Sequence, residues 1–401
     1  MKKSLFIILL ALFYLGKIGA FSCTIFNASR NGLVLVGNNE DLNSTDSVIW
    51  FYPPVNGKYG YCYVGFHSYG IQGGMNDQGL FFDYNALKFS KMESSPGKLS
   101  IKSWRWFIDK IMAECSSVED LINLLNQYNL GWWGSNQVMF VDAKGESAVI
   151  GADKTGKLSI VRKEGEYQVS TNFSLANPEF GAISYPCYRY EIANEMLKNM
   201  KELTVDYFRK ILAAVHQEGA NPTVYSNICD LTHKEIYLYN FHNFEEVAKF
   251  NLEEEFRKGE HSYEISSLFP RKTHAQKSFE EVQEKKLSHI LLKTILEEGI
   301  EAAIEKYNQS KAEASFMASE LENLIFSLSL KGRIRETIEI SKLYTQEFPN
   351  SLSGHKRLGD IYLKLGNEQK AIESYRRVLE LDPENGEVKE ILKHLRHKNI
   401  F

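Results

Sequence analysis

A spacing of 34 residues recurs in the last third of the chain and limits what that part can fold into. Gly332 and Gly366 are 34 residues apart, and so are Pro349 and Pro383. Between these breaks the apolar residues follow the spacing of amphipathic helices. A single pair of such helices cannot bury its apolar face alone, so the copies must stack on one another. The sequence therefore predicts that residues 284–401 form an all-α solenoid of helical pairs.

The best-formed copy lies between Leu352 and Pro383 and resembles a tetratricopeptide (TPR) repeat. The resemblance rests on the residues at its key positions, which are Leu358, Gly359, Tyr362, Ala371, Tyr375 and Pro383. Residues 317–351 resemble a degenerate copy, and an unrelated array of helical hairpins is the alternative. Concave helical repeats commonly bind peptides, so we expect a protein or peptide partner here, unless the repeats are an inert accessory.

The first 22 residues have the pattern of a secretory signal peptide. A short basic start precedes an uncharged apolar run at 5–15, and Ala20 and Ser22 place small residues just before Cys23. This pattern predicts cleavage after Ser22 and a secreted or periplasmic protein. The apolar run is shorter than the roughly 20 residues that cross a bilayer, so we expect no stable membrane span after processing.

The position of Cys23 leaves a second interpretation of this segment open. A lipoprotein signal also ends before a cysteine, and the thiol would then be acylated. Such a signal usually has an aliphatic residue three positions before the cysteine, where this chain has Ala20 followed by Phe21. A lipid anchor is therefore the minor alternative to a free N-terminal cysteine.

Composition excludes several classes of function. The chain has 401 residues and a net charge of −4, so it lacks the basic character of a nucleic-acid-binding protein. Its five cysteines have neither metal-ligand spacing nor the density of a disulfide scaffold, and no phosphate-binding loop is present. We therefore expect no metal and no cofactor. Sequence leaves open whether the four cysteines other than Cys23 form pairs; these are Cys62, Cys115, Cys187 and Cys229.

Residues 23–258 differ from the repeats because short strand-like runs alternate with helical patterns. The runs are rich in β-branched and aromatic residues, and they cover 23–28, 33–38, 61–66, 80–84, 137–142, 147–151, 167–171, 224–229 and 235–239. Helical patterns cover 101–114, 118–128, 186–198 and 205–216, and Ser117 is the expected N-cap of the second. This order favours an α+β fold built from layers of sheet and helix. Residues 259–283, with Pro270 and mixed charges, are predicted to be a linker.

Five short motifs occur in this region in a fixed order. They are Cys23-Thr24, Gly37-Asn38-Asn39-Glu40-Asp41, Gly73-Gly74-Met75-Asn76-Asp77-Gln78-Gly79-Leu80 with Asn85 after it, Ser170-Thr171-Asn172-Phe173 and Tyr188-Arg189-Tyr190. Together they resemble the N-terminal-nucleophile (Ntn) hydrolases of the linear amide C–N hydrolase type. That group contains choloylglycine hydrolases, penicillin V acylases, acid ceramidase-like amidases and isopenicillin N acyltransferases. The resemblance implies a four-layer αββα sandwich that acts on a linear, non-peptide amide.

The resemblance also implies a role for each of five residues. Cys23 would be the nucleophile, because an N-terminal cysteine carries both a thiol and an α-amine that can serve as its base. Asp41 would orient the ammonium or the thiol, and an antiparallel return of the chain brings it back beside Cys23. Asn172 and Asn85 would donate hydrogen bonds to the oxyanion. Arg189 would lower the thiol pKa and bind a carboxylate or the oxyanion.

One position departs from the family pattern. Bile salt and penicillin V hydrolases have an arginine where this chain has Asn38. The missing cation argues against a bile salt as substrate, and Asn38 and Asn39 are predicted to bind the substrate. Gly73 and Gly74 are expected to let the backbone approach closely at the rim of the site, or else to form a tight turn.

Three functions are compatible with these residues. The preferred hypothesis is an exported cysteine amidase that hydrolyses a small-molecule amide through a thioester on Cys23. The second is an acyltransferase of the same fold, in which an amine takes the acyl group in place of water. The third is a non-catalytic, lipid-anchored protein whose TPR repeats recruit a partner.

Overall fold

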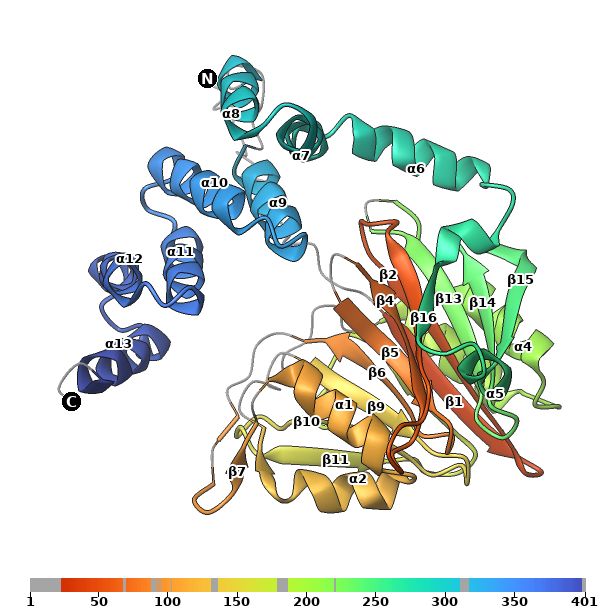
Figure 1. Cartoon of the computed structure of the whole chain (residues 1–401). Coiled ribbons are helices and arrows are strands. Elements are labelled where there is room, and N and C mark those ends of the chain that lie inside the picture. Colours follow the sequence, from red (N-terminus) through yellow and green to blue (C-terminus); the bar gives the residue numbers. More distant parts are fainter. Residues whose placement is uncertain are drawn as a thin grey trace, which may run out of the picture. The chain divides into compact units, whose positions relative to one another are not determined.

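The computed structural model of the chain describes residues 23–67, 70–87, 92–93, 95–101, 103–130, 136–178, 187–219, 221–310 and 317–398. The predicted signal peptide, residues 1–22, lies outside the described residues. The chain forms two compact units, of which one ends at Gln283 and the other begins at Glu284. Figure 1 shows the elements of both units.

Two antiparallel sheets make up most of the first unit. The six-stranded sheet has the order β12 (Tyr167–Ser170), β1 (Thr24–Arg30), β2 (Leu33–Asp41), β13 (Thr223–Asp230), β14 (Glu235–Asn240) and β15 (Asn243–Asn251). The eight-stranded sheet has the order β11 (Leu158–Arg162), β10 (Ser147–Ala152), β9 (Asn136–Val141), β6 (Phe81–Ala86), β5 (Gly70–Asn76), β4 (Tyr61–Phe66), β3 (Ser47–Tyr52) and β16 (His261–Glu264). A short parallel pair joins β7 (Leu99–Ser100) to β8 (Tyr128–Asn129).

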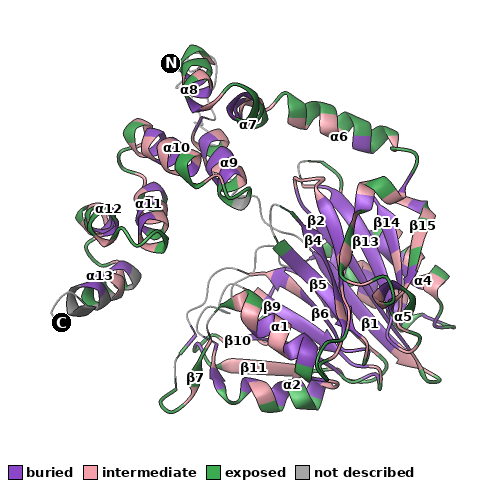
Figure 2. Ribbon diagram, viewed as in Figure 1, coloured by how far each residue is buried: buried purple, intermediate pink, exposed green. Residues whose placement is uncertain are grey.

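The central core lies between the two sheets. Successive side chains of a strand point to opposite faces, so every second residue of each sheet faces the other sheet. Ile25 and Val36 of the six-stranded sheet meet Phe51 and Phe81 of the eight-stranded sheet in this core. Figure 2 shows most strand residues of both sheets as buried.

Two helix pairs cover the outer faces of the sheets. Helices α1 (Trp104–Glu114) and α2 (Val118–Leu125) pack on the eight-stranded sheet, where they form a second core. Helices α3 (Tyr188–Lys198) and α4 (Val205–Val215) pack on the six-stranded sheet and form a third. The order helix, sheet, sheet, helix confirms the four-layer αββα sandwich.

Short polar side chains begin these helices. Ser117 is the N-cap of α2 as predicted, and its hydroxyl accepts a hydrogen bond from the backbone N–H of Asp120. Ser103 and Thr204 cap α1 and α4 in the same way. These caps end the preceding loops and fix where each helix meets its sheet.

Seven of the described strands were not predicted, namely β3, β5, β7, β8, β11, β15 and β16. In β5 the pair Gly73-Gly74 was expected at a rim or in a turn, but both glycines lie inside the strand. A side chain at Gly73 would collide with the carboxylate of Asp83, and one at Gly74 would collide with the Cys62 carbonyl. Glycine is therefore required here by close packing within the sheet.

The linker prediction for residues 259–283 is wrong. The strand β16 in this segment pairs with β3, and the ring of Tyr263 lies 5.5 Å from that of Phe250. A 3-10 turn, η2 (Ile265–Leu268), and helix α6 (His274–Glu284) follow. The mixed charge that suggested a linker belongs to an edge strand, whose outward side chains are exposed while Tyr263 packs inward.

Helices fill the second unit, as the 34-residue spacing predicts. They are α7 (Leu287–Glu297), α8 (Ile300–Ser310), α9 (Met317–Leu330), α10 (Ile334–Glu347), α11 (Leu352–Lys364), α12 (Glu368–Leu381) and α13 (Gly386–Lys398). Gly359 of α11 lies against the ring of Tyr375 of α12, so even a methyl group at Gly359 would collide with that ring. Within the described residues, no helix is both long enough and apolar enough to cross a membrane.

Candidate active site

The antiparallel hairpin of β1 and β2 brings Cys23 to the end of β2. The register pairs Thr24 with Asn39, so Cys23, one residue earlier, lies beside Glu40. Because successive side chains alternate, Cys23 and Glu40 point between the two sheets, whereas Thr24, Asn39 and Asp41 point toward α3 and α4. The hairpin therefore has two functional faces, which we call the inter-sheet face and the helix face.

On the inter-sheet face, the Cys23 thiol contacts a carboxylate. Cys23 Sγ donates to Glu40 Oε1 at 3.1 Å, and Asn38 Nδ2 donates to Glu40 Oε2 at 3.4 Å. All three residues are buried. The sequence analysis did not predict Glu40, although it stands in one of the five motifs. Side chains of a strand alternate between two faces, and Glu40 is the residue of β2 that lies across the hairpin from Cys23. This alternation is the signal in the sequence that could have identified Glu40.

The electrostatics of this face oppose ionisation of the thiol. Burial raises the pKa of Cys23 well above its usual value, and the carboxylates of Glu40, Asp41 and Asp83 raise it further. Burial also raises the pKa of Glu40 and that of Asp83, and the charge of Glu40 adds to the rise at Asp83. In the uncut chain the nitrogen of Cys23 is an amide and carries no charge. A protonated thiol therefore faces at least two poorly solvated carboxyl groups.

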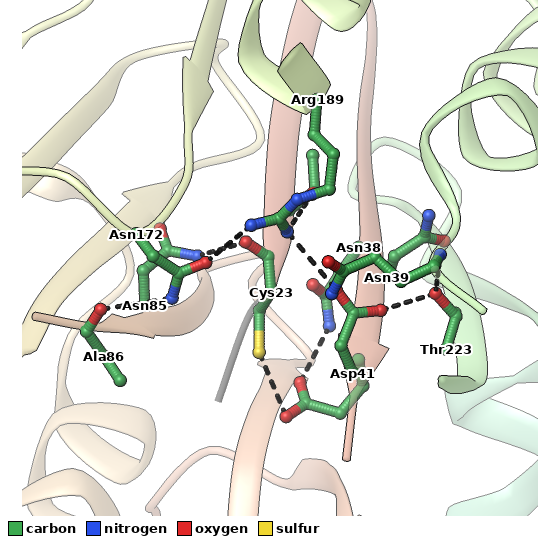
Figure 3. Close-up of polar contacts among 12 residues, drawn as sticks. Cys23, Asn38, Asn39, Asp41, Asn85, Ala86, Asn172, Arg189 and Thr223 are labelled. Atoms are coloured by element: carbon green, nitrogen blue, oxygen red, sulfur yellow. Dashed lines mark hydrogen bonds and ion pairs between the residues drawn. The ribbon is translucent and has the colours of Figure 1, made fainter. Parts of the chain in front are cut away.

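The helix face carries a buried ion pair. Arg189 Nη1 lies 3.3 Å from Asp41 Oδ2 and 2.8 Å from Thr24 Oγ1. Asp41 also accepts hydrogen bonds from the side chains of Thr223 and Gln217. Burial raises the pKa of Asp41 to about 7, although Arg189 and these hydrogen bonds act in the opposite direction. This network ties the start of β1, the end of β2 and the start of α3 together (Figure 3).

The two predicted oxyanion donors approach Cys23 from other strands. Asn85 of β6 donates from Nδ2 to the backbone carbonyl of Cys23 at 3.0 Å. Asn172 follows β12, and its Oδ1 accepts from Arg189 Nη2 at 2.9 Å while its Nδ2 donates to the Ala86 carbonyl at 3.1 Å. Figure 3 shows both asparagines on the same side of Cys23. The structure thus brings together Cys23, Asp41, Asn85, Asn172 and Arg189, which are the five predicted catalytic residues.

The prediction that Asn39 binds substrate conflicts with its position. Its Nδ2 donates to the Leu212 carbonyl of α4 at 2.9 Å, and its Oδ1 accepts from the Ser226 hydroxyl at 2.7 Å. The residue is fully buried on the helix face. Asn39 therefore fixes β2 against α4, whereas Asn38 lies on the same face as the thiol.

The prediction that Arg189 lowers the thiol pKa gains no support from the contacts of its guanidinium, which lie on the helix face. The pKa of Cys23 is raised by burial and by neighbouring carboxylates. The pleat of β2 sends Asp41 to the helix face, where it meets Arg189 of α3, and leaves Glu40 beside the thiol. Arg189 therefore connects the two strands to α3, and its effect on the thiol pKa stays a prediction.

In the part of the chain that the structure describes, one group of side chains could hold a metal ion, although the sequence predicts none. It consists of His216, Glu218 and His242, whose ligand atoms lie within 4.8 Å of one another. Burial, together with the neighbouring His216, lowers the pKa of His242 to about 4. His216 Nδ1 already lies 2.6 Å from the Ala213 carbonyl. None of these residues contacts the Cys23 thiol, so the group is not part of the reactive centre.

The family model for acyl-coenzyme A:6-aminopenicillanic acid acyl-transferase matches residues 28–252, which is more than half of the chain. The chain belongs to this family. The family has the Ntn-hydrolase fold and contains amidases and acyltransferases. A tetratricopeptide repeat model matches residues 353–385, which confirms the repeat in the second unit.

Solved structures resemble the chain only distantly. A variant of conjugated bile acid hydrolase from Clostridium perfringens is 19% identical, and the match covers 60% of this chain and 96% of that one with a TM-score of 0.47. Penicillin V acylase from Agrobacterium tumefaciens is 16% identical over 54% of this chain and 83% of that one, with a TM-score of 0.37. The first TPR domain of Spaghetti, bound to an HSP90 peptide, is 18% identical over 29% of this chain and 91% of that one, with a TM-score of 0.22. No curated protein matches the chain.

Proposed function

We propose that the chain is an exported cysteine amidase that hydrolyses a linear, non-peptide amide through a thioester on Cys23. The observation that carries this proposal is the position of Cys23 at the head of β1. Its thiol is hydrogen-bonded to Glu40, and its backbone carbonyl is hydrogen-bonded to Asn85. Membership of a family of amidases and acyltransferases supports this class of chemistry.

Cleavage after Ser22 would free the α-amine of Cys23, and such an amine has a usual pKa of about 7.7–8.0. The amine takes the thiol proton, with the Glu40 carboxylate as a second acceptor 3.1 Å from Sγ. The thiolate attacks the carbonyl carbon of the substrate, so an S–C bond forms and the carbonyl oxygen becomes an oxyanion. Asn172 and Asn85 are the proposed donors to that oxyanion.

Collapse of this tetrahedral intermediate breaks the C–N bond. The leaving amine takes the proton held by the α-ammonium, which leaves a thioester on Cys23 and a neutral α-amine. A water molecule then gives its proton to the α-amine as its oxygen attacks the thioester. The carboxylic acid product departs and the proton returns to the thiol, which restores the enzyme.

Removal of the signal peptide would also change the charge at the thiol. In the uncut chain, burial and three carboxylates raise the thiol pKa. The α-ammonium of the cut chain adds one positive charge on the same residue, which favours the thiolate. We therefore expect the reactivity of Cys23 to appear only after cleavage.

Export is supported by the basic start, the apolar run and the small residues before Cys23. We propose a secreted or periplasmic location on this basis. A lipid anchor on Cys23 would block the thiol, so it is incompatible with the amidase proposal.

An acyltransferase is the second candidate, and the description of the matching family favours it. Both reactions share the first half, up to the thioester on Cys23. They differ in whether water or an amine takes the acyl group. Product analysis with and without an added amine separates them, because only a transferase makes the new amide.

The experiment that tests the proposal is intact-mass analysis of protein purified from a secreting host, before and after iodoacetamide. We expect a chain that begins with unmodified Cys23 and reacts rapidly at that residue, followed by hydrolysis of an amide in a substrate screen. Cys23→Ser is the matched control, since it retains the four other cysteines, all of them buried. A lipid-sized addition on Cys23, or a chain that begins elsewhere, would contradict the amidase and favour a scaffold whose TPR repeats bind a protein or peptide.

A further inference from the structure

Three neighbouring strands place Cys23, Glu40 and Tyr225 in one row. Cys23 of the β1 end contacts Glu40 of β2, and Glu40 is the register partner of Tyr225 on β13. Asp83 faces this row from β6 in the other sheet. It lies two residues before Asn85, whose amide contacts the Cys23 carbonyl, so both side chains point to the same face of β6.

This row is lined by hydrogen-bond acceptors. Glu40 and Asp83 contribute carboxylates and are 0% and 1% exposed. The Tyr225 hydroxyl and Asn38 Oδ1 are buried and have no hydrogen-bond partner among the described residues. Burial raises the pKa of Tyr225, and the nearby charges of Glu40 and Asp83 raise it further. Buried polar atoms normally have partners, so this cluster is suited to a ligand that donates hydrogen bonds.

The balance of charge points to a cation. In the described part of the chain, no lysine, arginine or histidine forms an ion pair with Glu40 or Asp83, whereas Arg189 pairs with Asp41 on the helix face. The α-ammonium of a chain that begins at Cys23 can balance one of the two remaining carboxylates. The other carboxyl group has no positive partner and is held protonated by burial, because a buried charge without a partner is costly. A cationic ligand would supply that partner and favour the ionised form of this group.

We propose that Glu40, Asp83 and Tyr225 bind a protonated amine of the substrate, so that the preferred substrate is an amide with a cationic amine close to the scissile carbonyl. This inference rests on the proposed function of Cys23 as nucleophile. An ammonium group carries three N–H donors and matches two carboxylates and one hydroxyl oxygen.

The charge preference can be measured at the thiol without knowing the substrate. Methanethiosulfonate reagents form a mixed disulfide with a thiolate and release methanesulfinate, and they exist as a cation (2-aminoethyl) and an anion (2-sulfonatoethyl). We would measure the rate of modification of Cys23 by each reagent, with peptide mapping, on the mature protein. Comparing the two rates at one pH cancels the degree of thiol ionisation.

We expect the cationic reagent to react faster with the wild-type protein, and Asp83→Asn to lower the ratio of cation to anion rates about tenfold or more, given the strength of charge interactions at buried sites. Tyr225→Phe should lower the ratio less. Asp153→Asn is the matched control, because Asp153 lies in the turn between β10 and β11 of the same sheet, outside the row, and its substitution should leave the ratio unchanged.

Two results would overturn the cation site. One is an equal ratio in the wild-type protein and Asp83→Asn, and the other is a preference for the anionic reagent. Either result would leave Cys23 as a reactive nucleophile and the amidase proposal intact. A thiol at Cys23 that no reagent modifies would contradict both proposals, whereas selective labelling without turnover of any amide would contradict the amidase alone.

Discussion

The two faces of the β1–β2 hairpin are built from adjacent residues but differ in how their polar groups are satisfied. On the helix face, Asp41 has three side-chain partners and Asn39 uses both of its amide atoms. On the inter-sheet face, one oxygen of Asn38 and the Tyr225 hydroxyl have no partner among the described residues, and Glu40 contacts a thiol. The period of two thus separates a face that holds the strands in place from a face that is available for chemistry.

This difference teaches that burial alone does not identify the reactive residues of such a site. Asn38 and Asn39 are both completely buried and stand next to each other in the sequence. What separates them is whether the surrounding chain already satisfies their hydrogen bonds. Substitutions on the helix face should therefore reduce stability, whereas those on the inter-sheet face should change the reaction.

The largest effect is expected on the inter-sheet face at Cys23. Cys23→Ser should be processed and folded but lose turnover by about 1000-fold or more, because the hydroxyl is a far weaker nucleophile near neutral pH. Steady-state assays of the mature protein check this result. Turnover close to that of the wild-type protein would remove the distinction between the faces, since Cys23 would then not be the nucleophile.

On the helix face, Arg189→Met should destabilise the first unit by about 3–5 kcal/mol, because it leaves Asp41 buried without its ion-pair partner. Urea unfolding monitored by circular dichroism measures this change. The matched control is Arg209→Met, whose ion pairs involve the more exposed Asp206 and Glu245 and should contribute only about 0.2–1 kcal/mol. Equal losses in both variants would show that the buried pair has no special structural role.

Asn172 links the two faces. Its Oδ1 accepts a hydrogen bond from Arg189, and its side-chain amide is a candidate donor to the oxyanion. Asn172→Ala should lower kcat by about 100- to 1000-fold with a smaller effect on KM, since an oxyanion donor acts mainly in the transition state. Measuring kcat and KM of this variant decides whether Asn172 acts in the transition state or in the binding of substrate. A change in KM with kcat preserved would show that Asn172 binds the substrate in its ground state and does not stabilise the oxyanion.

The neighbouring asparagines offer the most direct comparison of the faces. Asn39→Ala should cost about 1–3 kcal/mol of stability, because it leaves the Leu212 carbonyl and the Ser226 hydroxyl without their partner, and should leave KM unchanged. Asn38→Ala should change kcat/KM and cost less stability. Unfolding and kinetic measurements on the same two proteins test the pair. The reverse pattern would restore Asn39 as a substrate-binding residue.

The smallest effect is expected in the pH dependence of stability. The pKa of Asp83 is raised in the folded chain by burial and by Glu40, so the fold favours its protonated form. The contribution of Asp83 to the free energy of unfolding is therefore complete below its usual pKa of about 3.9, where the group is protonated. That contribution is lost as pH rises from there toward the raised pKa. Asp83→Asn should match the wild-type protein near pH 4 and exceed its stability by about 1 kcal/mol or more near pH 9.

Thermal unfolding at the two pH values measures this difference. Asn at position 83 can still accept the hydrogen bond from the Tyr84 N–H, so the comparison isolates the charge. Asp153→Asn should show no such gain at high pH, because the pKa of Asp153 is lowered in the folded chain by hydrogen bonds to Thr155. Parallel curves for the wild-type protein and Asp83→Asn would show that Asp83 is not a buried charge.

The sequence predicted the layered α+β fold, the helical repeats and the residues that gather at Cys23. It succeeded where a local signal decides, such as the Ser117 cap of α2 or the 34-residue spacing. It missed β5, because Gly73 and Gly74 have low strand propensity and the reason for them, contact with Asp83 and Cys62, is tertiary. It missed β15 because the many charged residues of this edge strand resemble a loop.

Within the site, the family resemblance supplied residues but not the faces on which they lie. Arg189 was predicted to act on the thiol and Asn39 to bind the substrate, whereas the hydrogen-bond partners of both lie on the helix face. Glu40 was not predicted, because the family motif assigns the carboxylate role to Asp41, the residue after it. These differences depend on hydrogen-bond partners far apart in the sequence, such as Leu212 and Ser226, which no motif contains.

The strand β16 decides where the two units can be separated. It lies at the edge of the eight-stranded sheet and covers the backbone of β3 through pairs such as Tyr263 with Ile49. A chain shortened at Lys258 would leave the apolar strand β3 with an open edge, which invites pairing with other molecules. A chain that ends after Gln283 would keep that edge closed, so the point of truncation governs whether the isolated first unit is prone to aggregate.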